Sequence, residues 1–229
     1  MRRAHRLLAG VLAAGALALS VTGCGGPAGP ADMKAAGEVA QGARSGLPPV
    51  VDRVPTENKV VFLVFGDEAQ RDPDFVPMVK ELRLPVSLFL TGHVAGPGYA
   101  HLGELASVGA TVQNHTLDHP YLPGLPYEGQ RWEICGQQHK LKTRFGQRPR
   151  LLRPPHGAYD TDTLRAAADC GITALVRGRA AGAQLQRLQP GDIILPHAPQ
   201  AASLTETTTR LVHRIRARGF RVARLEDYL

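Results

Sequence analysis

A carboxylate and two imidazoles stand at positions of this chain from which they could bind one divalent metal ion. Asp67 comes directly after the apolar run Val60–Phe65, and His115 and His119 follow about fifty residues later, four apart. Such a set of three ligands leaves coordination positions open for water and for a substrate. A metal held in this way polarises a carbonyl group and lowers the pKa of its bound water. The residue types therefore indicate a hydrolytic metal centre.

Each of these residues also has a plain structural reading. A lone buried histidine usually belongs to the core, but two histidines four apart share one face of a helical turn, so their ring nitrogens can converge. The alternative for Asp67, a carboxylate that follows a strand, is a plain turn or cap residue. The position of Asp67 at the end of a predicted strand favours the metal reading.

Two further segments could bring chemistry to the same place. Arg153–Gly157 contains two prolines and a glycine, which predict a rigid loop whose free backbone N–H groups could bind an oxyanion. The plain alternative is a strand-to-helix turn with Asp160 as the helix cap. Gly191–His197 contains a short apolar strand that delivers His197 just beyond its end.

Short apolar segments alternate with helix-like segments from about residue 55 onward. The predicted strands are Val60–Phe65, Val86–Leu90, Thr111–Asn114, Leu151–Arg153, Ile172–Val176, Asp192–Leu195 and Arg221–Ala223. The predicted helices are Asp74–Leu82, Tyr99–Val108, Tyr127–Phe145, Thr161–Cys170 and Thr205–Arg218. This alternation predicts an α/β fold, a distorted (β/α) barrel, complete or incomplete, of about seven parallel strands. In such barrels the chemistry collects at the C-terminal strand ends, and four candidate residues follow one: Asp67, His115, Arg153 and His197.

The composition argues against a nucleic-acid-binding protein. The formal net charge is +7, and three of the arginines lie in the first six residues, which leaves +4 for the rest of the chain. We see no basic stripe with interleaved aromatic residues, so we expect no nucleic-acid partner. The basic run Arg210–Arg218 reads as the solvated face of a surface helix, with attraction to anionic wall polymers or lipid headgroups as the alternative. We expect a monomer.

The first residues predict export and lipidation. A basic start precedes the apolar stretch Leu7–Val21, which is short for a membrane span. The segment Val21–Cys24 resembles a bacterial lipobox, which implies a signal peptide over residues 1–23 and acylation of Cys24; an ordinary signal peptide is the alternative. Residues 24–54, rich in Gly, Ala and Pro, predict a flexible tether, and residues 55–229 the folded domain. We therefore expect an exported protein, held only by its lipid anchor at the outer face of the bacterial cytoplasmic membrane.

Two cysteines, Cys135 and Cys170, remain after Cys24. An exported chain meets an oxidising compartment, where an even pair favours a disulfide. Two buried free thiols are the alternative.

From about Lys59 to Leu229 the chain resembles the NodB-homology polysaccharide deacetylase family, the fourth carbohydrate esterase family. The segment His115–His119 matches the second motif of this family, Arg153–Gly157 the third, and Leu195–His197 the fifth. The resemblance implies a distorted (β/α) barrel. It also implies metal-dependent removal of N- or O-acetyl groups from chitin oligomers, peptidoglycan or other acetylated polysaccharides.

The resemblance also implies roles for individual residues. Asp67, His115 and His119 would bind zinc or another divalent metal. The backbone around His156, between Pro155 and Gly157, would hold the oxyanion, and Leu195 would line the pocket for the acetyl methyl group. His197 would protonate the leaving group, and Arg153 would belong to the catalytic machinery.

Three departures from the family pattern bear on catalysis. Gly66 stands where active members carry the Asp that serves as general base, and the loss of a positioned base typically costs 10²–10⁴-fold in rate. Arg153 loses its expected carboxylate partner as well. The fourth motif has no clear match, because Val176–Arg179 offers only glycine and arginines where an Asp and a Trp are expected.

Glu68 is one carbon longer than Asp and two residues later, and it could reach Arg153 or the metal-bound water. The sequence therefore leaves two readings open. One is an impaired deacetylase that acts on an acetylated glycan. The other is a catalytically inactive family member that binds metal and a glycan or a protein partner at the cell surface.

Overall fold

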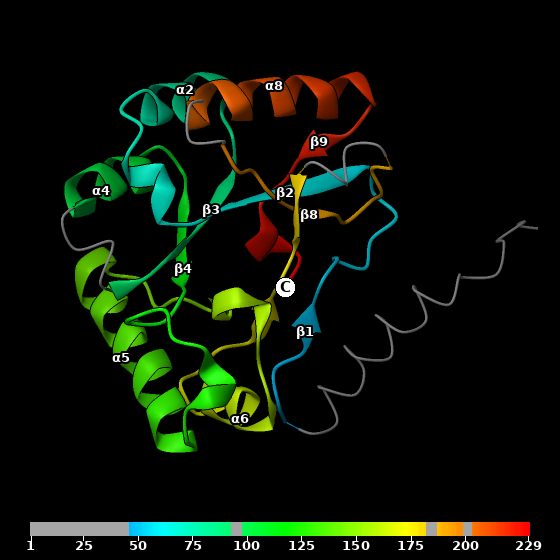
Figure 1. Ribbon diagram of the computed structural model, residues 1–229. Helices are drawn as coiled ribbons and strands as arrows, with labels where there is room; N and C mark the ends of the chain where they lie inside the picture. The colour runs from blue at the N-terminus through cyan, green and yellow to red at the C-terminus, as the bar shows by residue number, and fades with distance from the viewer. Residues whose placement is uncertain (1–45, 93–97, 182–186, 199–202) are drawn as a thin grey trace, which may run out of the picture.

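The computed structural model of the chain describes residues 46–92, 98–181, 187–198 and 203–229 (Figure 1). The predicted signal peptide, Cys24 and most of the predicted tether lie outside the described residues. In the described ranges, no helix has both the length and the apolar character that a membrane span requires.

One sheet organises the described part of the chain. Its strands are β1 (Val50–Val51), β2 (Val60–Phe65), β3 (Val86–Leu90), β4 (Thr111–Asn114), β5 (Leu151–Leu152), β6 (Ala174–Val176), β7 (Arg179–Ala180), β8 (Ile193–Leu195) and β9 (Arg221–Val222). Their order is β1-β6-β5-β4-β3-β2-β8-β7, β9 pairs with β2, and every strand pairing is parallel. The sheet curls into an incomplete barrel, which confirms the predicted fold class.

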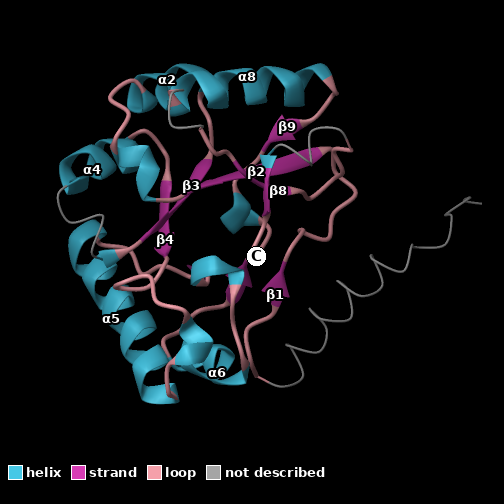
Figure 2. Cartoon of the chain, in the orientation of Figure 1, coloured by secondary structure: helices cyan, strands magenta, loops and turns pink. Residues whose placement is uncertain are grey.

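Helices cover the outside of the curled sheet (Figure 2). They are α2 (Phe75–Leu82), α4 (Tyr99–Ser107), α5 (Tyr127–Phe145), α6 (Thr161–Asp169) and α8 (Leu204–Ala217). Short 3₁₀ segments lie at Asp67–Gln70 (η1), Leu122–Gly124 (η3), Pro155–Gly157 (η4) and Leu225–Asp227 (η5). Helices α2 and α8 lie side by side over one end of the sheet, and helices α5 and α6 lie over the other end (Figure 1).

Strand β2 is buried on both faces, and this explains its unbroken apolar sequence. Val61, Leu63 and Phe65 belong to the core between sheet and helices. The alternate residues Phe62 and Val64 belong to a second core inside the curl. Two hydrophobic layers therefore meet at β2.

The C-terminal segment fills the inside of the curl opposite the strand ends that carry the candidate residues (Figure 1). In η5, the Glu226 carboxylate accepts hydrogen bonds from Ser87, Thr111 and Gln113 at 2.6–3.2 Å. The Tyr228 ring packs edge-on against Phe62, with 5.0 Å between the ring centroids. The chain's last residues thus act as a plug that ties β3 and β4 together from within.

The predicted elements with long apolar or amphipathic patterns match the structure closely. Strands β2, β3 and β4 and helix α5 have the predicted bounds, and the other predicted elements are shorter by one or two residues at an end or shifted by one. The sequence analysis missed β1 and β7, which have two residues each. The predicted tether boundary was wrong, because β1 pairs with β6 and Val51 and Val54 are buried, so the domain begins before residue 50.

The disulfide Cys135–Cys170 joins α5 to the end of α6. The two cysteines are 35 residues apart, and closing a loop of that length stabilises the fold by about 3–4 kcal/mol in the chain-entropy account. The two cysteines therefore form a disulfide rather than remaining free thiols. The disulfide fastens helix α5, which packs against β4.

The segment after β1 closes the curl onto the start of β8. Arg53 forms an isolated antiparallel bridge with Asp192, and the Val54 N–H donates to the Gly191 carbonyl at 2.9 Å. A Cβ atom on Gly191 would lie 1.9 Å from the Val54 carbonyl oxygen. Only glycine fits at this approach.

Replacing Gly191 by alanine is expected to destabilise the fold far more than the same change at Gly219. Both glycines have positive φ angles, 83° and 76°, so alanine is strained by about 1–2 kcal/mol at either. At Gly191 the added methyl group also collides with backbone, which adds about 1–3 kcal/mol, whereas a Cβ on Gly219 meets nothing within 4 Å. Urea denaturation of both variants measures the difference, and equal losses would contradict this account of the closure.

Candidate functional site

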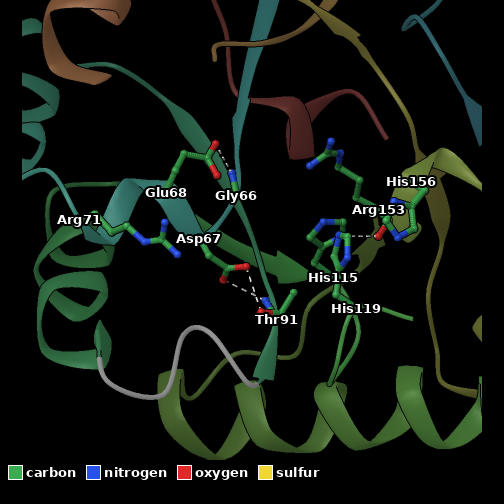
Figure 3. Close-up of a pocket in the computed structure, with 9 residues that line it drawn as sticks. All are labelled: Gly66, Asp67, Glu68, Arg71, Thr91, His115, His119, Arg153 and His156. Atoms are coloured by element: carbon green, nitrogen blue, oxygen red, sulfur yellow. Dashed lines mark hydrogen bonds between the residues drawn. The ribbon is translucent and has the colours of Figure 1, made fainter. Parts of the chain in front are cut away.

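Four neighbouring strands end around one pocket. In the order β2, β3, β4, β5, they are followed by Asp67, Thr91, His115 and Arg153. Parallel neighbours place their C-terminal ends at one edge, and these four residues line a pocket of about 520 Å³ (Figure 3). The remaining lining residues are Gly66, Glu68, Arg71, His119 and His156.

The carboxylate of Asp67 is directed at the end of β3. Its Oδ1 accepts the Thr91 backbone N–H at 3.1 Å and its Oδ2 accepts the Thr91 hydroxyl at 2.9 Å. Burial raises the pKa of Asp67, and the two hydrogen bonds from Thr91 oppose that effect. Both oxygens are therefore engaged by a neighbouring strand.

The imidazole of His115 is fixed in one orientation. Its Nδ1 lies 2.7 Å from the backbone carbonyl oxygen of Arg153, and because a carbonyl only accepts, Nδ1 carries the proton and Nε2 keeps its lone pair. Burial, and next the charge of Arg153, lower the pKa of His115 to about 3. This ring is thus neutral at physiological pH, with a free nitrogen.

Three imidazoles form a row along one wall of the pocket. The ring centroids of His115 and His119 are 4.7 Å apart and those of His119 and His156 4.8 Å, both in edge-to-face contact. Burial, followed by the charge of His156, lowers the pKa of His119. Burial therefore favours the neutral form of both His115 and His119.

The predicted helical turn over His115–His119 was wrong. The segment is an irregular bend, and Thr116 and His119 have positive φ angles of 69° and 57°. The two imidazoles are neighbours because of this bend and not because of helical spacing.

Arg153 faces the pocket from the end of β5 (Figure 3). Burial lowers the pKa of its guanidinium, and the charges of Glu68 and Asp67 oppose the shift. Among the described residues, no side chain forms an ion pair or hydrogen bond with this guanidinium. It therefore remains available to a polar group that enters the pocket.

Helix α5 holds the bend between the two histidines. The Glu133 Oε2 accepts the backbone N–H groups of Leu117 and Asp118 at 3.0 and 2.9 Å. The Asn114 side chain donates to the Ile134 carbonyl at 2.9 Å. The two bonds to Glu133 satisfy backbone groups that the bend leaves unpaired, and the Asn114 bond ties the end of β4 to α5.

The predicted metal ligands share the pocket but do not meet at one point. Across the described ranges, no three His, Cys, Asp or Glu side chains are arranged so that they could hold a single ion. The reason lies with Asp67, whose two oxygens both bind Thr91 rather than face His115 and His119. As placed, the side chains do not fit a metal.

Comparison with known proteins adds independent information. Residues 53–175 match the family described as polysaccharide deacetylase. An uncharacterized protein of Streptomyces coelicolor is 56% identical over 228 residues, which cover 93% of this chain and 92% of that protein.

The chain belongs to the polysaccharide deacetylase family.

Two solved structures have the same fold. One is a family 4 carbohydrate esterase from Bacillus anthracis, with a TM-score of 0.69 and 23% identity over 89% of this chain and 93% of that chain. The other is a mutant, with restored enzymatic activity, of a family 4 pseudoenzyme from Bacillus anthracis. It has a TM-score of 0.69 and 20% identity, and covers 79% of this chain and 71% of that chain.

Several residues that the deacetylase resemblance selects do not line the pocket. Leu195 is half-buried against the inner core, and His197 is exposed two residues beyond β8. Pro155 is buried, and of the three residues Pro155–Gly157 only His156 lines the pocket. His156 has a positive φ of 58°, and its backbone N–H finds no acceptor in the described part of the chain.

The region in place of the fourth deacetylase motif forms an ion pair. The Arg177 guanidinium donates to both carboxylate oxygens of Asp52, at 2.8 and 2.5 Å, and lies over the Tyr159 ring at 5.6 Å. Gly178 packs so closely on β8 that a Cβ would lie 2.5 Å from Leu195. This pair joins the segment after β1 to the one after β6.

Sequence reasoning missed three residues of this site. Thr91 follows a predicted strand, so the rule that found Asp67 could also have found it. Arg71 lines the pocket from just after η1, and Glu133 reaches the bend from a helix. No sequence signal marks the last two, because their roles arise only from packing.

Replacing Glu133 by alanine is expected to loosen the bend between His115 and His119. Two backbone N–H groups would lose their acceptor, at a cost of about 1–3 kcal/mol. Amide hydrogen exchange at Leu117 and Asp118 measures the effect, and Glu133→Gln, which keeps an acceptor oxygen, should restore much of the protection. Glu104→Ala, on the exposed face of α4, is the matched control; unchanged exchange in Glu133→Ala would overturn the assignment.

Replacing His115 by glutamine is expected to make the fold less sensitive to acid. The pKa of His115 falls from 6.5 to about 3 on folding, so below pH 6.5 the unfolded chain binds a proton that the folded chain does not. Wild-type stability is thus lost at up to about 1.4 kcal/mol per pH unit as pH falls from 6.5 toward 3. Urea denaturation at pH 7, 6 and 5, with a chelator present, measures the free energy of unfolding. The difference in this free energy between wild type and variant should narrow as the pH falls. Parallel profiles would contradict the prediction, and exposed His213→Gln is the control.

Proposed function

We propose that this protein removes acetyl groups from an N- or O-acetylated glycan of the cell-wall or chitin type, at a low rate. The observation that carries the proposal is the set of polar residues that four adjacent strands deliver to one open pocket in a chain of the polysaccharide deacetylase family. A pocket of about 520 Å³ has room for an acetylated sugar unit.

The pocket residues suit the hydrolysis of an acetyl group. Attack by water on the acetyl carbon places negative charge on the carbonyl oxygen, and donors directed at that oxygen lower the barrier. The unpaired guanidinium of Arg153 and the unpaired N–H of His156 are two such donors. Leu195 ends β8 and His197 lies two residues beyond it, and we assign them the methyl contact and the proton donation in a substrate complex.

The proposal includes a divalent metal ion, and zinc is the first candidate for it. Family deacetylases generally depend on a metal, and Asp67, His115 and His119 offer the donor types that zinc prefers. Bound there, an ion would activate water and polarise the acetyl carbonyl. Because these side chains do not meet at one point, metal binding requires at least one of them to move.

A catalytically inactive, glycan-binding or protein-binding family member is the second candidate. It is favoured by Gly66, which places no side chain where active relatives carry a base. A fold neighbour is described as a pseudoenzyme, which gives this reading a precedent in the family.

We further propose that the chain is exported and held by a lipid on Cys24 at the outer face of the cytoplasmic membrane. The lipobox-like segment Val21–Cys24 is the support for this. A surface location would bring the pocket to wall glycans, consistent with the proposed substrate.

Purified protein incubated with zinc is expected to release acetate from at least one of N-acetylated chitin oligomers, peptidoglycan fragments and acetylated xylan. His119→Ala should lower that rate by about tenfold or more, because it removes an imidazole from the pocket wall. Acetate is measured by an enzyme-coupled assay, and bound metal by mass spectrometry after desalting. Exposed His213→Ala is the control and should behave like wild type.

The outcomes separate the readings. Acetate release without retained metal would remove the metal from the proposal and leave the deacetylase standing. Retained metal or bound glycan without acetate release would support the inactive reading. If the protein neither binds metal or glycan nor releases acetate, both readings are overturned.

A further inference from the structure

The carboxylate of Glu68 occupies the space that a side chain on residue 66 would need. Its Oε1 accepts the Gly66 backbone N–H at 2.9 Å. An ideal Cβ built on Gly66 would lie 2.7 Å from the Glu68 Oε2, and its three nearest neighbours are all atoms of that carboxyl group. The side chain has turned back over the glycine (Figure 3).

The backbone of residue 66 does not itself demand glycine. Its φ of −101° and ψ of −153° lie in extended space that any residue adopts. No backbone atom is among the three nearest neighbours of the Cβ position. The three atoms nearest to a Cβ on residue 66 all belong to the Glu68 carboxyl group, so that group lies where a side chain on residue 66 would begin.

Glu68 also has a free oxygen in the pocket, unlike Asp67. Both Asp67 oxygens accept hydrogen bonds from Thr91. The Glu68 Oε2 has no hydrogen-bond partner in the ranges that the structure describes. Of the carboxylate oxygens that line the pocket, it is the one with no hydrogen bond to the described residues.

The group that Glu68 faces supports a role in the reaction. Glu68 and Arg153 lie on opposite walls of the pocket (Figure 3), and Glu68 is the first of the charges that favour the cationic form of Arg153. No ion pair closes the gap between them among the described residues. A substrate carbonyl between the two would meet a proton acceptor on one side and a cation on the other.

We propose that Glu68 is the proton acceptor of this pocket and takes the place of the side chain that Gly66 lacks. The attacking water gives one proton to Glu68 as its oxygen bonds to the acetyl carbon. The bond from that carbon to the glycan nitrogen or oxygen then breaks, and the leaving group takes up a proton. Water is the only co-reactant, and the products are acetate and the free amine or alcohol. The inference rests on the proposed deacetylation.

Glu68→Gln should lower kcat for acetate release by about 10²-fold or more, with little change in KM, because the amide fills the same space without accepting the proton. Gly66→Asp combined with Glu68→Ala, which empties that space, returns the carboxylate to residue 66 and should recover at least tenfold over Glu68→Ala. Formate should partly rescue Glu68→Ala, because a small carboxylate can enter the emptied space. Glu104→Gln, a charge loss on the surface of α4, should leave the rate unchanged.

Gly66→Ala tests the shared space without removing an acid. Its methyl group would stand 2.7 Å from the Glu68 Oε2, so the carboxyl group must move, and kcat should fall toward that of Glu68→Gln. A crystal structure of Gly66→Ala should show the carboxyl group displaced and the Gly66 N–H bond lost. An undisplaced carboxyl group would overturn the account of a shared space.

The failure of this inference differs from the failure of the proposed function. If wild type releases acetate and Glu68→Gln does so equally well, Glu68 is not the acceptor and the deacetylase stands. If wild type releases none but Gly66→Asp does, the pocket lacks an acceptor and the assignment of Glu68 is overturned. If neither releases acetate, the proposed deacetylation fails, and this inference with it.

Discussion

The pocket depends on the register of four adjacent parallel strands. Leu90 pairs with Asn114 and Asn114 with Leu152, so β3, β4 and β5 end at one height. Backbone bonds continue this ladder beyond the strand ends, where the His115 N–H donates to Leu90 and the Arg153 N–H to Asn114, at 3.1 and 3.0 Å. A slip of one residue would turn each pocket side chain to the other face of the sheet. The buried apolar faces of the strands fix the register and thereby the site.

The pocket wall contains backbone strain that the surrounding structure must hold. Thr116, His119 and His156 all have positive φ angles, each at a cost of order 1–3 kcal/mol. The Glu133 side chain of α5 binds the loop that contains the first two, and the disulfide fastens α5 to the end of α6. Strained residues of this kind persist only where the neighbours fix them, and here the neighbours are a helix, a disulfide and the strand ends.

The parts of the fold that could be predicted from the sequence are those in which each residue's own chemistry decides its place. Val60–Phe65 is apolar throughout and had to be a strand covered on both faces. Strands β1 and β7 have two residues each and no pattern, and they exist only because neighbours offer hydrogen bonds. The same division applies to the site. Strand ends revealed Asp67, His115 and Arg153, but the engagement of Asp67 by Thr91 and the support from Glu133 depend on side-chain geometry that no spacing encodes.

Positions 66 and 68 show how an aligned position can mislead about the chemistry of a pocket. An alignment of this sequence with active relatives shows a glycine at position 66 in place of an acid. In the structure, however, the carboxyl group of Glu68 lies directly beside residue 66. Delivery from two residues away has a physical consequence. Fixing a Glu side chain costs about 1.5–2 kcal/mol of rotamer entropy, and one hydrogen bond to a charged group contributes about 1.5–3 kcal/mol. The folded-back conformation is therefore only slightly favoured over an open one. A carboxylate that must be held in this way is less preorganised than one on a short side chain at residue 66, and preorganisation is what lowers the barrier. The low rate that we propose for this protein is what such a less preorganised carboxylate predicts.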